Sequence, residues 1–244
     1  MKNFFKLIKR ILGILILLAI LFVCYVVYDG YNLYKTVINE VSIDKAIATL
    51  KSDENYVPLE NIPKSYLNAV ISIEDKRFYE HGAIDLISTL RAVFVNLASL
   101  DLTEGGSTIT QQLAKNLYFT QEKKFTRKIA ELFVATDIEN VLISKDDILE
   151  LYVNAIYYGD GYTGIYDASM GYFNKEPKDL TLYEQTLLAG LPNAPSIYAL
   201  SNNSNLSYER QNQVVDAMAK LNYITQNEAK EIYKTNSYIF QKAP

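Results

Sequence analysis

Apolar positions follow one another without a charge from Ile11 to Tyr28, and the preceding segment is basic, with Lys2, Lys6, Lys9 and Arg10. At about 1.5 Å per residue this run reaches roughly 27 Å as a helix, close to the hydrocarbon thickness of a bilayer. The pattern therefore predicts a membrane-spanning helix.

The basic flank predicts that residues 1–10 form a cytoplasmic tail and that the rest of the chain lies outside. The alternative is a cleaved signal peptide, which would need a shorter apolar core and small residues at a cleavage site, and "CYVVYDGY" lacks these. We therefore expect a retained transmembrane anchor over residues 11–29. Cys24 follows Phe22 and Val23 rather than small residues, which argues against its lipidation.

Beyond the anchor, apolar positions recur with helical spacing and alternating strand patterns are scarce. Residues 30–55 mix polar and apolar positions and predict a membrane-proximal helix and connector, and residues 56–244 predict one mainly α domain. Pro63 fits the first position of a helix over "KSYLNAVISIED". Tyr157–Tyr162 is the strand candidate. Further helices are expected at Leu86–Leu97, Ile109–Tyr118, Thr126–Leu142, Asp146–Asn154, Leu182–Leu191, Tyr208–Leu221 and Gln226–Tyr233.

The composition excludes several classes of function. A net charge of −4 and the absence of a Lys/Arg stripe beyond the N-terminus argue against a nucleic-acid partner. One cysteine and one histidine exclude an intrachain disulfide framework and a Cys/His metal cluster, so we expect no resident metal site. Catalysis by a Ser-His-Asp or Cys-His group would depend on His81 alone.

The first candidate for chemistry is "IEDKRFYEHGAID", in which Glu74 follows the apolar residues Ile71–Ile73. A carboxylate at the end of a buried helix can lose solvent, which raises its pKa and suits a proton acceptor. A solvated helix end is the alternative, and it is the better interpretation of this segment taken alone.

The second candidate is "GGSTITQQLAK", where two glycines precede hydroxyls, amides and a lysine. Thr108 and Gln111 fit an S/T-x-x-Q capping box for a helix that begins near Ile109, and its first-turn N–H groups would form an anion site. An ordinary capped helix is the alternative. A capping box does not explain why Gln112 and Lys115 are also polar.

Two further segments carry charge at helical spacing. In "KKFTRKIAE", Arg127 and Lys128 lie four and three residues before Glu131, which indicates either an exposed ion pair or a carboxylate kept ionised by cations that face a polyanion. In "KDDILELYVN", Glu150 and Asn154 share a face beside apolar residues, and we interpret this segment as scaffolding.

In this order and at these spacings, "EDKRFYEHGAID", "GGSTITQQLAKNL", "RKIAE" and "ILELYVN" resemble the peptidoglycan glycosyltransferases. These are the lysozyme-like domains of monofunctional cell-wall polymerases and of the front part of bifunctional penicillin-binding proteins. The similarity runs from about Tyr56 to Tyr223 and includes "YYGDGYTGIYDASMGYF" and "TLLAGLPNAPSIYAL". Departures are small: Ala83 replaces a usual Gly, Val153 a usual Leu, and Ala130 a basic or polar residue of some relatives.

The resemblance implies polymerisation of lipid II, a disaccharide-peptide on a polyprenyl diphosphate, with inversion at the anomeric carbon. Glu74 matches the catalytic base and Glu131 the second essential carboxylate. The resemblance also leaves room for a divalent cation, Mg²⁺ or Mn²⁺, at the diphosphate. Implied or expected substrate-binding residues are Asp75, Phe78, His81, Ser107, Thr108, Gln111, Gln112, Lys115, Asn116, Lys123, Arg127 and Lys128.

The chemistry agrees with this resemblance. A glycosidase must protonate an alkoxide leaving group, whereas a diphosphate leaves as a stable anion and needs neutralisation by cations and hydrogen-bond donors. The alternatives are a hydrolase or lytic transglycosylase of similar fold and a non-enzymatic membrane scaffold. The segment "SIDK" at Ser42–Lys45 is the only S-x-x-K match and has no accompanying K-T-G, so we expect a monofunctional enzyme. Expected partners are lipid II, the growing glycan strand, the bilayer and other cell-wall synthesis proteins.

Overall fold

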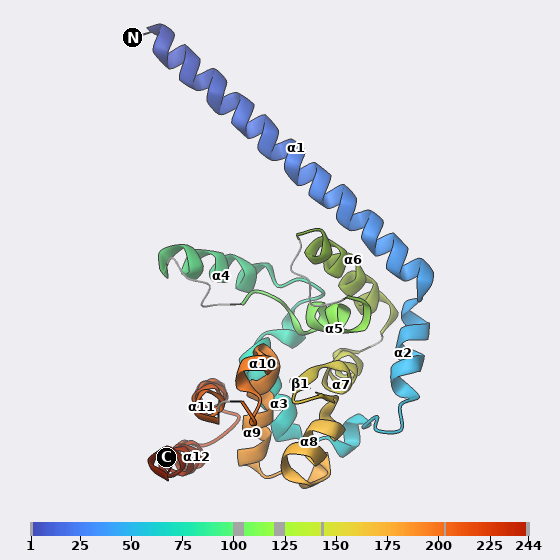
Figure 1. Cartoon of the computed structure of the whole chain (residues 1–244), viewed down its shortest axis with the longest axis vertical. Helices are drawn as coiled ribbons and strands as arrows, with labels where there is room; N and C mark the ends of the chain where they lie inside the picture. The colour runs from blue at the N-terminus through green and yellow to red at the C-terminus, as the bar shows by residue number, and fades with distance from the viewer. Residues whose placement is uncertain (1, 100–104, 120–124, 143, 203, 243–244) are drawn as a thin grey trace.

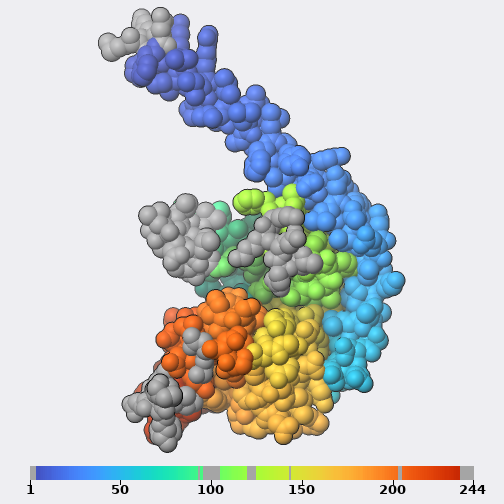
Figure 2. All heavy atoms as spheres, in the orientation of Figure 1, coloured from blue at the N-terminus to red at the C-terminus, as the bar shows by residue number. Residues whose placement is uncertain are grey.

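A computed structural model describes residues 2–99, 105–119, 125–142, 144–202 and 204–242. The first element is one long helix, α1 (Lys2–Glu40), whose N-terminal part projects away from the rest of the chain (Figures 1 and 2). By length and composition α1 can cross a membrane, and its most apolar window is not covered by other parts of the described chain. The expected apolar helix is therefore present, and it continues without a break to Glu40, into the segment of residues 30–55 for which a membrane-proximal helix and connector were expected.

The C-terminal part of α1 packs against α6 (Phe125–Val141). The rings of Tyr31 and Tyr34 both lie 5.3 Å from the ring of Phe133, and the Tyr34 hydroxyl donates to Asp137 Oδ2 at 2.6 Å. Gly30 allows the closest approach, because a Cβ there would lie 2.6 Å from the Ile129 Cβ. The apolar helix and the helix that carries Glu131 are thus packed directly on each other.

The mainly helical fold class is confirmed. After α1 the chain forms, in order, α2 (Ile43–Lys51), α3 (Lys64–Glu74), α4 (Leu86–Ser99), α5 (Ile109–Tyr118), α6, α7 (Lys145–Ala155), α8 (Ile165–Phe173), α9 (Leu182–Gly190), α10 (Pro195–Tyr198), α11 (Ser204–Lys220) and α12 (Gln226–Lys242), with short 3₁₀ turns between some of them.

Two sets of helices surround the core. Helix α5 packs against α6 and α7, and α3 packs against α9 and α11. Fully buried side chains that join these sets include Tyr66 of α3, Leu113 of α5, Tyr152 of α7 and Leu188 of α9. This arrangement brings the C-terminal end of α3 to α5, which is where the site is built.

The predicted helices are all present, and most of their ends differ by a few residues; α12, predicted to end at Tyr233, continues to Lys242. Helix α3 begins at Lys64 because Pro63 is its N-cap rather than its first residue. The strand candidate is a two-stranded hairpin of β1 (Tyr157–Gly159) and β2 (Tyr162–Thr163). The sequence interpretation missed α8, which follows immediately after Gly164 at φ +82°, so that glycine-rich turn ends the hairpin and starts a helix.

The segment interpreted as scaffolding has that role in the structure. Asn154 of α7 pairs with the backbone of Val57, accepting from its N–H at 2.8 Å and donating to its carbonyl at 2.9 Å. Glu150 accepts from the Leu59 N–H at 3.0 Å and from the Tyr56 hydroxyl. These contacts fasten the connector before α3 to α7, and so hold α3 in place.

Candidate functional site

Glu74 is the last residue of α3, and its side chain is only 7% exposed. Its two oxygens have different partners. The Gln112 amide of α5 donates to Oε2 at 2.7 Å, and Arg210 Nη2 of α11 lies 3.3 Å from Oε1. A carboxylate held from two sides by long-range contacts has a fixed orientation, as a proton acceptor requires.

Glu131 is 2% exposed and lies among cations. Arg127 Nε lies 2.9 Å from Oε1 and Lys128 Nζ 3.2 Å from Oε2. Arg127 Nε is close enough to Glu131 Oε1 for an ion pair, but the N–H is not aligned for a hydrogen bond. This contact is therefore electrostatic. Lys128 Nζ also donates to Ser107 Oγ at 2.7 Å. The predicted ion pairs are therefore present, and they lie in a buried setting rather than on an exposed helix face.

Lys115 of α5 is influenced by the charges of both glutamates. Its pKa is below the ordinary lysine value, first because the amine is partly buried. The nearby charges of Arg127 and Lys128 lower the pKa further, whereas Glu131 and Glu74 act in the opposite direction. Because Lys115 is influenced by both glutamates, α5 connects the surroundings of Glu74 with the cations beside Glu131.

The N-terminus of α5 differs from the expected anion site. Thr108 is the N-cap and accepts from the Gln111 N–H at 3.2 Å, as predicted. The reciprocal bond of a capping box is not formed, because the Gln111 amide donates to the Ala83 carbonyl at 2.9 Å, as does the Thr108 hydroxyl. The Ile109 N–H is also engaged, since it donates to Asp75 Oδ2 at 3.1 Å. A carboxylate of the chain itself thus occupies this helix end.

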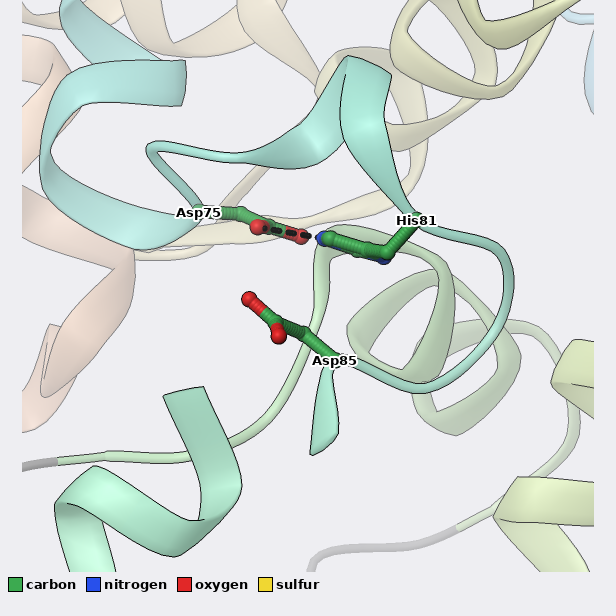
Figure 3. Close-up of side chains that lie close together, drawn as sticks. All are labelled: Asp75, His81 and Asp85. Atoms are coloured by element: carbon green, nitrogen blue, oxygen red, sulfur yellow. Dashed lines mark hydrogen bonds and ion pairs between the residues drawn. The ribbon is translucent and has the colours of Figure 1, made fainter. Parts of the chain in front are cut away.

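Asp75, His81 and Asp85 lie together beside this helix end (Figure 3), with candidate ligand atoms within 4.8 Å of one another. His81 Nε2 is 2.8 Å from Asp75 Oδ1. Both Asp85 oxygens accept from Arg77 at 3.1 Å, and the Ile87 N–H adds a further bond.

These contacts test whether the group fits a divalent cation. A cation here would have to displace the Arg77 guanidinium from Asp85 and the helix N–H from Asp75. The group therefore does not fit the Mg²⁺ or Mn²⁺ that the resemblance allows. Burial disfavours the Asp85 carboxylate, but hydrogen bonds from Ser88 and the Arg77 charge prevail and lower its pKa to about 2, as expected for a structural ion pair.

The other predicted residues divide into two groups. Phe78 is fully buried beneath Lys145 Nζ, which fits packing rather than substrate contact. The first group stabilises the junction between α5 and the loop after α3, and it also includes Thr108, Gln111, Asp75 and His81. The second group lies around the two glutamates and comprises Ser107, Gln112, Lys115, Arg127 and Lys128. Asn116 is next to this group, because its side chain donates to the Gln112 carbonyl at 2.8 Å. Lys123 lies outside the described residues.

Sequence reasoning missed Arg210. It follows Glu209 in "ERQNQVV" of α11, 136 residues from the glutamate that it contacts. A buried arginine on the apolar side of a predicted helix is a signal that it needs an anionic partner. That signal could have been noticed, but nothing in the spacing identifies Glu74 as the partner.

Comparisons with known proteins identify the family and several relatives of this chain. The Transglycosylase family matches residues 43–219. A putative transglycosylase of Cupriavidus necator is 42% identical over 75% of this chain and 78% of its own length. Penicillin-binding protein 1F of Bacillus subtilis is 43% identical over 76% of this chain, and penicillin-binding protein 1A of Vibrio cholerae is 44% identical over 80%.

The chain spans about a quarter of the length of these two penicillin-binding proteins, 26% and 24%. Among solved structures, penicillin-binding protein 1A of Haemophilus influenzae matches 72% of this chain and 17% of its own, with 22% identity. The TM-score of this structural match is 0.42.

Proposed function

We propose that this chain, which belongs to the transglycosylase family, polymerises lipid II into glycan strands and releases polyprenyl diphosphate with inversion at the anomeric carbon. The observation that carries the proposal is the division of the site. Glu74 is held by Gln112 and Arg210, a group of cations surrounds Glu131, and both glutamates influence Lys115.

In the proposed reaction Glu74 takes the proton from the 4-hydroxyl of the acceptor sugar. The acceptor oxygen forms a bond to the anomeric carbon of the donor from the face opposite the diphosphate, so the configuration inverts. The bond between that carbon and the diphosphate oxygen breaks, and the electron pair leaves with the diphosphate. Lys115, Arg127 and Lys128 offset the charge that develops on the departing oxygens.

Glu131 has a supporting role in this scheme. It holds Arg127 and Lys128 at fixed positions, so that their remaining N–H groups can face the diphosphate. The hydrolase alternative needs a protonated carboxylic acid at the leaving oxygen. Glu131 lies against two cations instead, an arrangement that suits an anionic leaving group better than an alkoxide.

Exposed apolar side chains on one end of the domain support a function at the surface of a bilayer. Helix α4 lies at the end of the domain nearest the apolar part of α1 (Figure 1). Its side chains Leu86, Ile87, Leu90 and Phe94 are more than half exposed, and Phe125 at the start of α6 is 78% exposed. We propose that α1 is the single-pass anchor, that residues 30–55 and the domain over 56–244 lie on the extracytoplasmic side, and that this apolar end rests on the membrane.

The test is incubation of the detergent-solubilised full chain with lipid II, followed by separation of the products by size. We expect a ladder of glycan strands, no clearing of purified cell-wall sacculi, and loss of the ladder in Glu74→Gln. Clearing of sacculi without strands from lipid II would establish the hydrolase instead. A Glu74→Gln variant with undiminished polymerisation would show that the base is another residue.

A further inference from the structure

We infer that Tyr152 is a positioning residue that orients the side-chain amide of Gln112 so that its NH₂ group, and not its oxygen, faces Glu74. The inference rests on the proposed role of Glu74 and extends it to α7. The Tyr152 hydroxyl donates to Gln112 Oε1 at 3.2 Å, and Gln112 Nε2 donates to Glu74 Oε2 at 2.7 Å.

The hydrogen bonds from Tyr152 through Gln112 to Glu74 have a fixed order of donors and acceptors. A carboxylate can only accept, so the Glu74 side of the amide must be the NH₂ group. The opposite end of the amide then presents its oxygen, which needs a donor, and the Tyr152 hydroxyl supplies one. Turning the amide by half a rotation would place Oε1 against Glu74 Oε2, two acceptors facing each other, and would leave Nε2 beside the hydroxyl.

Tyr152 is suited to this task because its protonation is constant. The side chain has no exposed surface. Burial raises the pKa of its phenol well above the ordinary value, the nearby negative charges of Glu74 and Asp75 add to this, and Arg210 opposes it. The hydroxyl therefore remains a donor throughout the pH range in which a glutamate changes charge.

Further charged or titratable groups near Glu74 are Asp75, the next residue in the chain, and side chains from three helices. Arg210 of α11 and Lys115 of α5 are cations near the carboxylate, and Tyr66 of α3 is a buried phenol within reach of its charge. Arg210 and Lys115 favour the anionic form of the glutamate, as the Gln112 donor does. Removal of Tyr152's hydroxyl would weaken the Gln112 contribution and leave those of Arg210 and Lys115.

The consequence is specific. Without the hydroxyl, Gln112 Oε1 loses its donor and the amide can rotate away from Glu74, so the carboxylate loses for part of the time a donor that favours its charged form. We expect Tyr152→Phe to reduce kcat/KM about tenfold on the acidic side of the pH profile and to move the acidic limb upward by about half to one pH unit. Activity should approach the wild-type value at higher pH, where the glutamate is ionised in both proteins.

Tyr158 provides a matched control. It is also a tyrosine of the same core without exposed surface, and its hydroxyl lies 2.5 Å from that of Tyr66 and donates to the Val153 carbonyl at 3.3 Å. It has no hydrogen bond to Gln112 among those of the described residues. Tyr158→Phe should reduce thermal stability to a similar extent as Tyr152→Phe and leave the acidic limb unmoved.

A double-mutant cycle tests whether Tyr152 acts through Gln112. Gln112→Met removes the amide at similar length, and adding Tyr152→Phe to it should change the acidic limb no further. The experiment is the pH dependence of kcat/KM for lipid II polymerisation by the full chain in detergent, together with its thermal unfolding temperature.

The outcomes separate this inference from the proposed function. Equal acidic limbs in Tyr152→Phe and Tyr158→Phe, or additive shifts in the double variant, would overturn the positioning role while the loss of activity in Glu74→Gln still supports the base. Retained activity in Glu74→Gln would remove the base and this inference with it.

Discussion

Glu74 and Glu131 are both buried glutamates on helices of one site, and the molecule holds them in opposite ways. The partners of Glu131 are three and four residues before it on the same helix, and both are cations. The partners of Glu74 are 38 and 136 residues away, and only one of them is charged. One carboxylate is part of a cationic cluster; the other stands apart from it.

This difference indicates different tasks. Two adjacent cations surround Glu131, and its charge reduces the repulsion between those cations. Glu74 has one ion pair at 3.3 Å and one neutral donor, so it can accept a proton without disrupting a cluster. The comparison teaches that two glutamates of one site can be held in different ways when their partners come from different elements.

The sharpest test of this comparison is to neutralise each glutamate in turn. Glu74→Gln should reduce kcat by about 10³-fold with KM nearly unchanged, because it removes the general base, and it should also cost some thermal stability because the buried Arg210 loses its ion pair. Glu131→Gln should raise KM for lipid II and lower the free energy of unfolding by about 2 kcal/mol, because Arg127 and Lys128 lose their shared partner. Steady-state kinetics and thermal unfolding measure both.

A Glu131→Gln variant that lost only kcat, with the wild-type KM and unfolding temperature, would give this residue a direct role in the chemistry. The division between base and structural anion would then be wrong.

The second test is the arginine that reaches Glu74 from α11. Arg210→Gln removes the cation that lies 3.3 Å from this carboxylate, which favours its protonated form. We expect kcat/KM to fall about 10- to 30-fold at neutral pH and the acidic limb of the profile to move upward. Arg210→Lys should restore part of the loss because it keeps the charge. An unchanged acidic limb in Arg210→Gln would mean that Arg210 serves packing alone.

The same contrast explains how far the sequence could predict the site. The Glu131 cluster was predictable because helical spacing alone places Arg127 and Lys128 on its side. The Thr108 cap and most helices were predictable for the same local reason. None of these predictions needs to know how the helices pack.

The Glu74 environment depends on packing. Arg210 reaches Glu74 only because α11 packs on α3, and Gln112 turns toward it only because α5 lies beside the end of α3. An anion does lie at the α5 N-terminus, but it is Asp75 of a different segment, and the spacing of residues along the chain does not reveal this. Helix α8 was missed because its start depends on a positive φ at Gly164, which spacing does not reveal.

A third test acts on Glu131 from outside the site, through the contact between α1 and α6. Gly30→Ala would place a Cβ 2.6 Å from the Ile129 Cβ and 2.8 Å from the Thr126 carbonyl oxygen, so the two helices must separate. We expect a loss of about 1–3 kcal/mol in the free energy of unfolding and a higher KM, with the acidic limb that reports Glu74 unmoved. Gly13→Ala is the matched control on the same helix, because nothing lies within 4 Å of a Cβ there. Equal unfolding temperatures for the two variants in detergent would contradict the tight α1–α6 contact.

The smallest expected effect concerns Lys115, which is influenced by the charges of both glutamates. Its pKa is below the usual lysine value because of burial, and then because of Arg127 and Lys128. As pH rises through this lowered pKa, the amine loses its proton and its attraction for a diphosphate, so the alkaline limb of kcat/KM should begin below the range of an exposed lysine. Lys115→Arg keeps a positive charge at high pH and should extend that limb upward, with activity within a few-fold of the wild type at neutral pH. The exposed Lys76 supplies the control, since Lys76→Arg should leave the limb in place. An alkaline limb that is the same in all three proteins would show that the charge of Lys115 does not limit the reaction, and the cationic half of the site would then rest on Arg127 and Lys128.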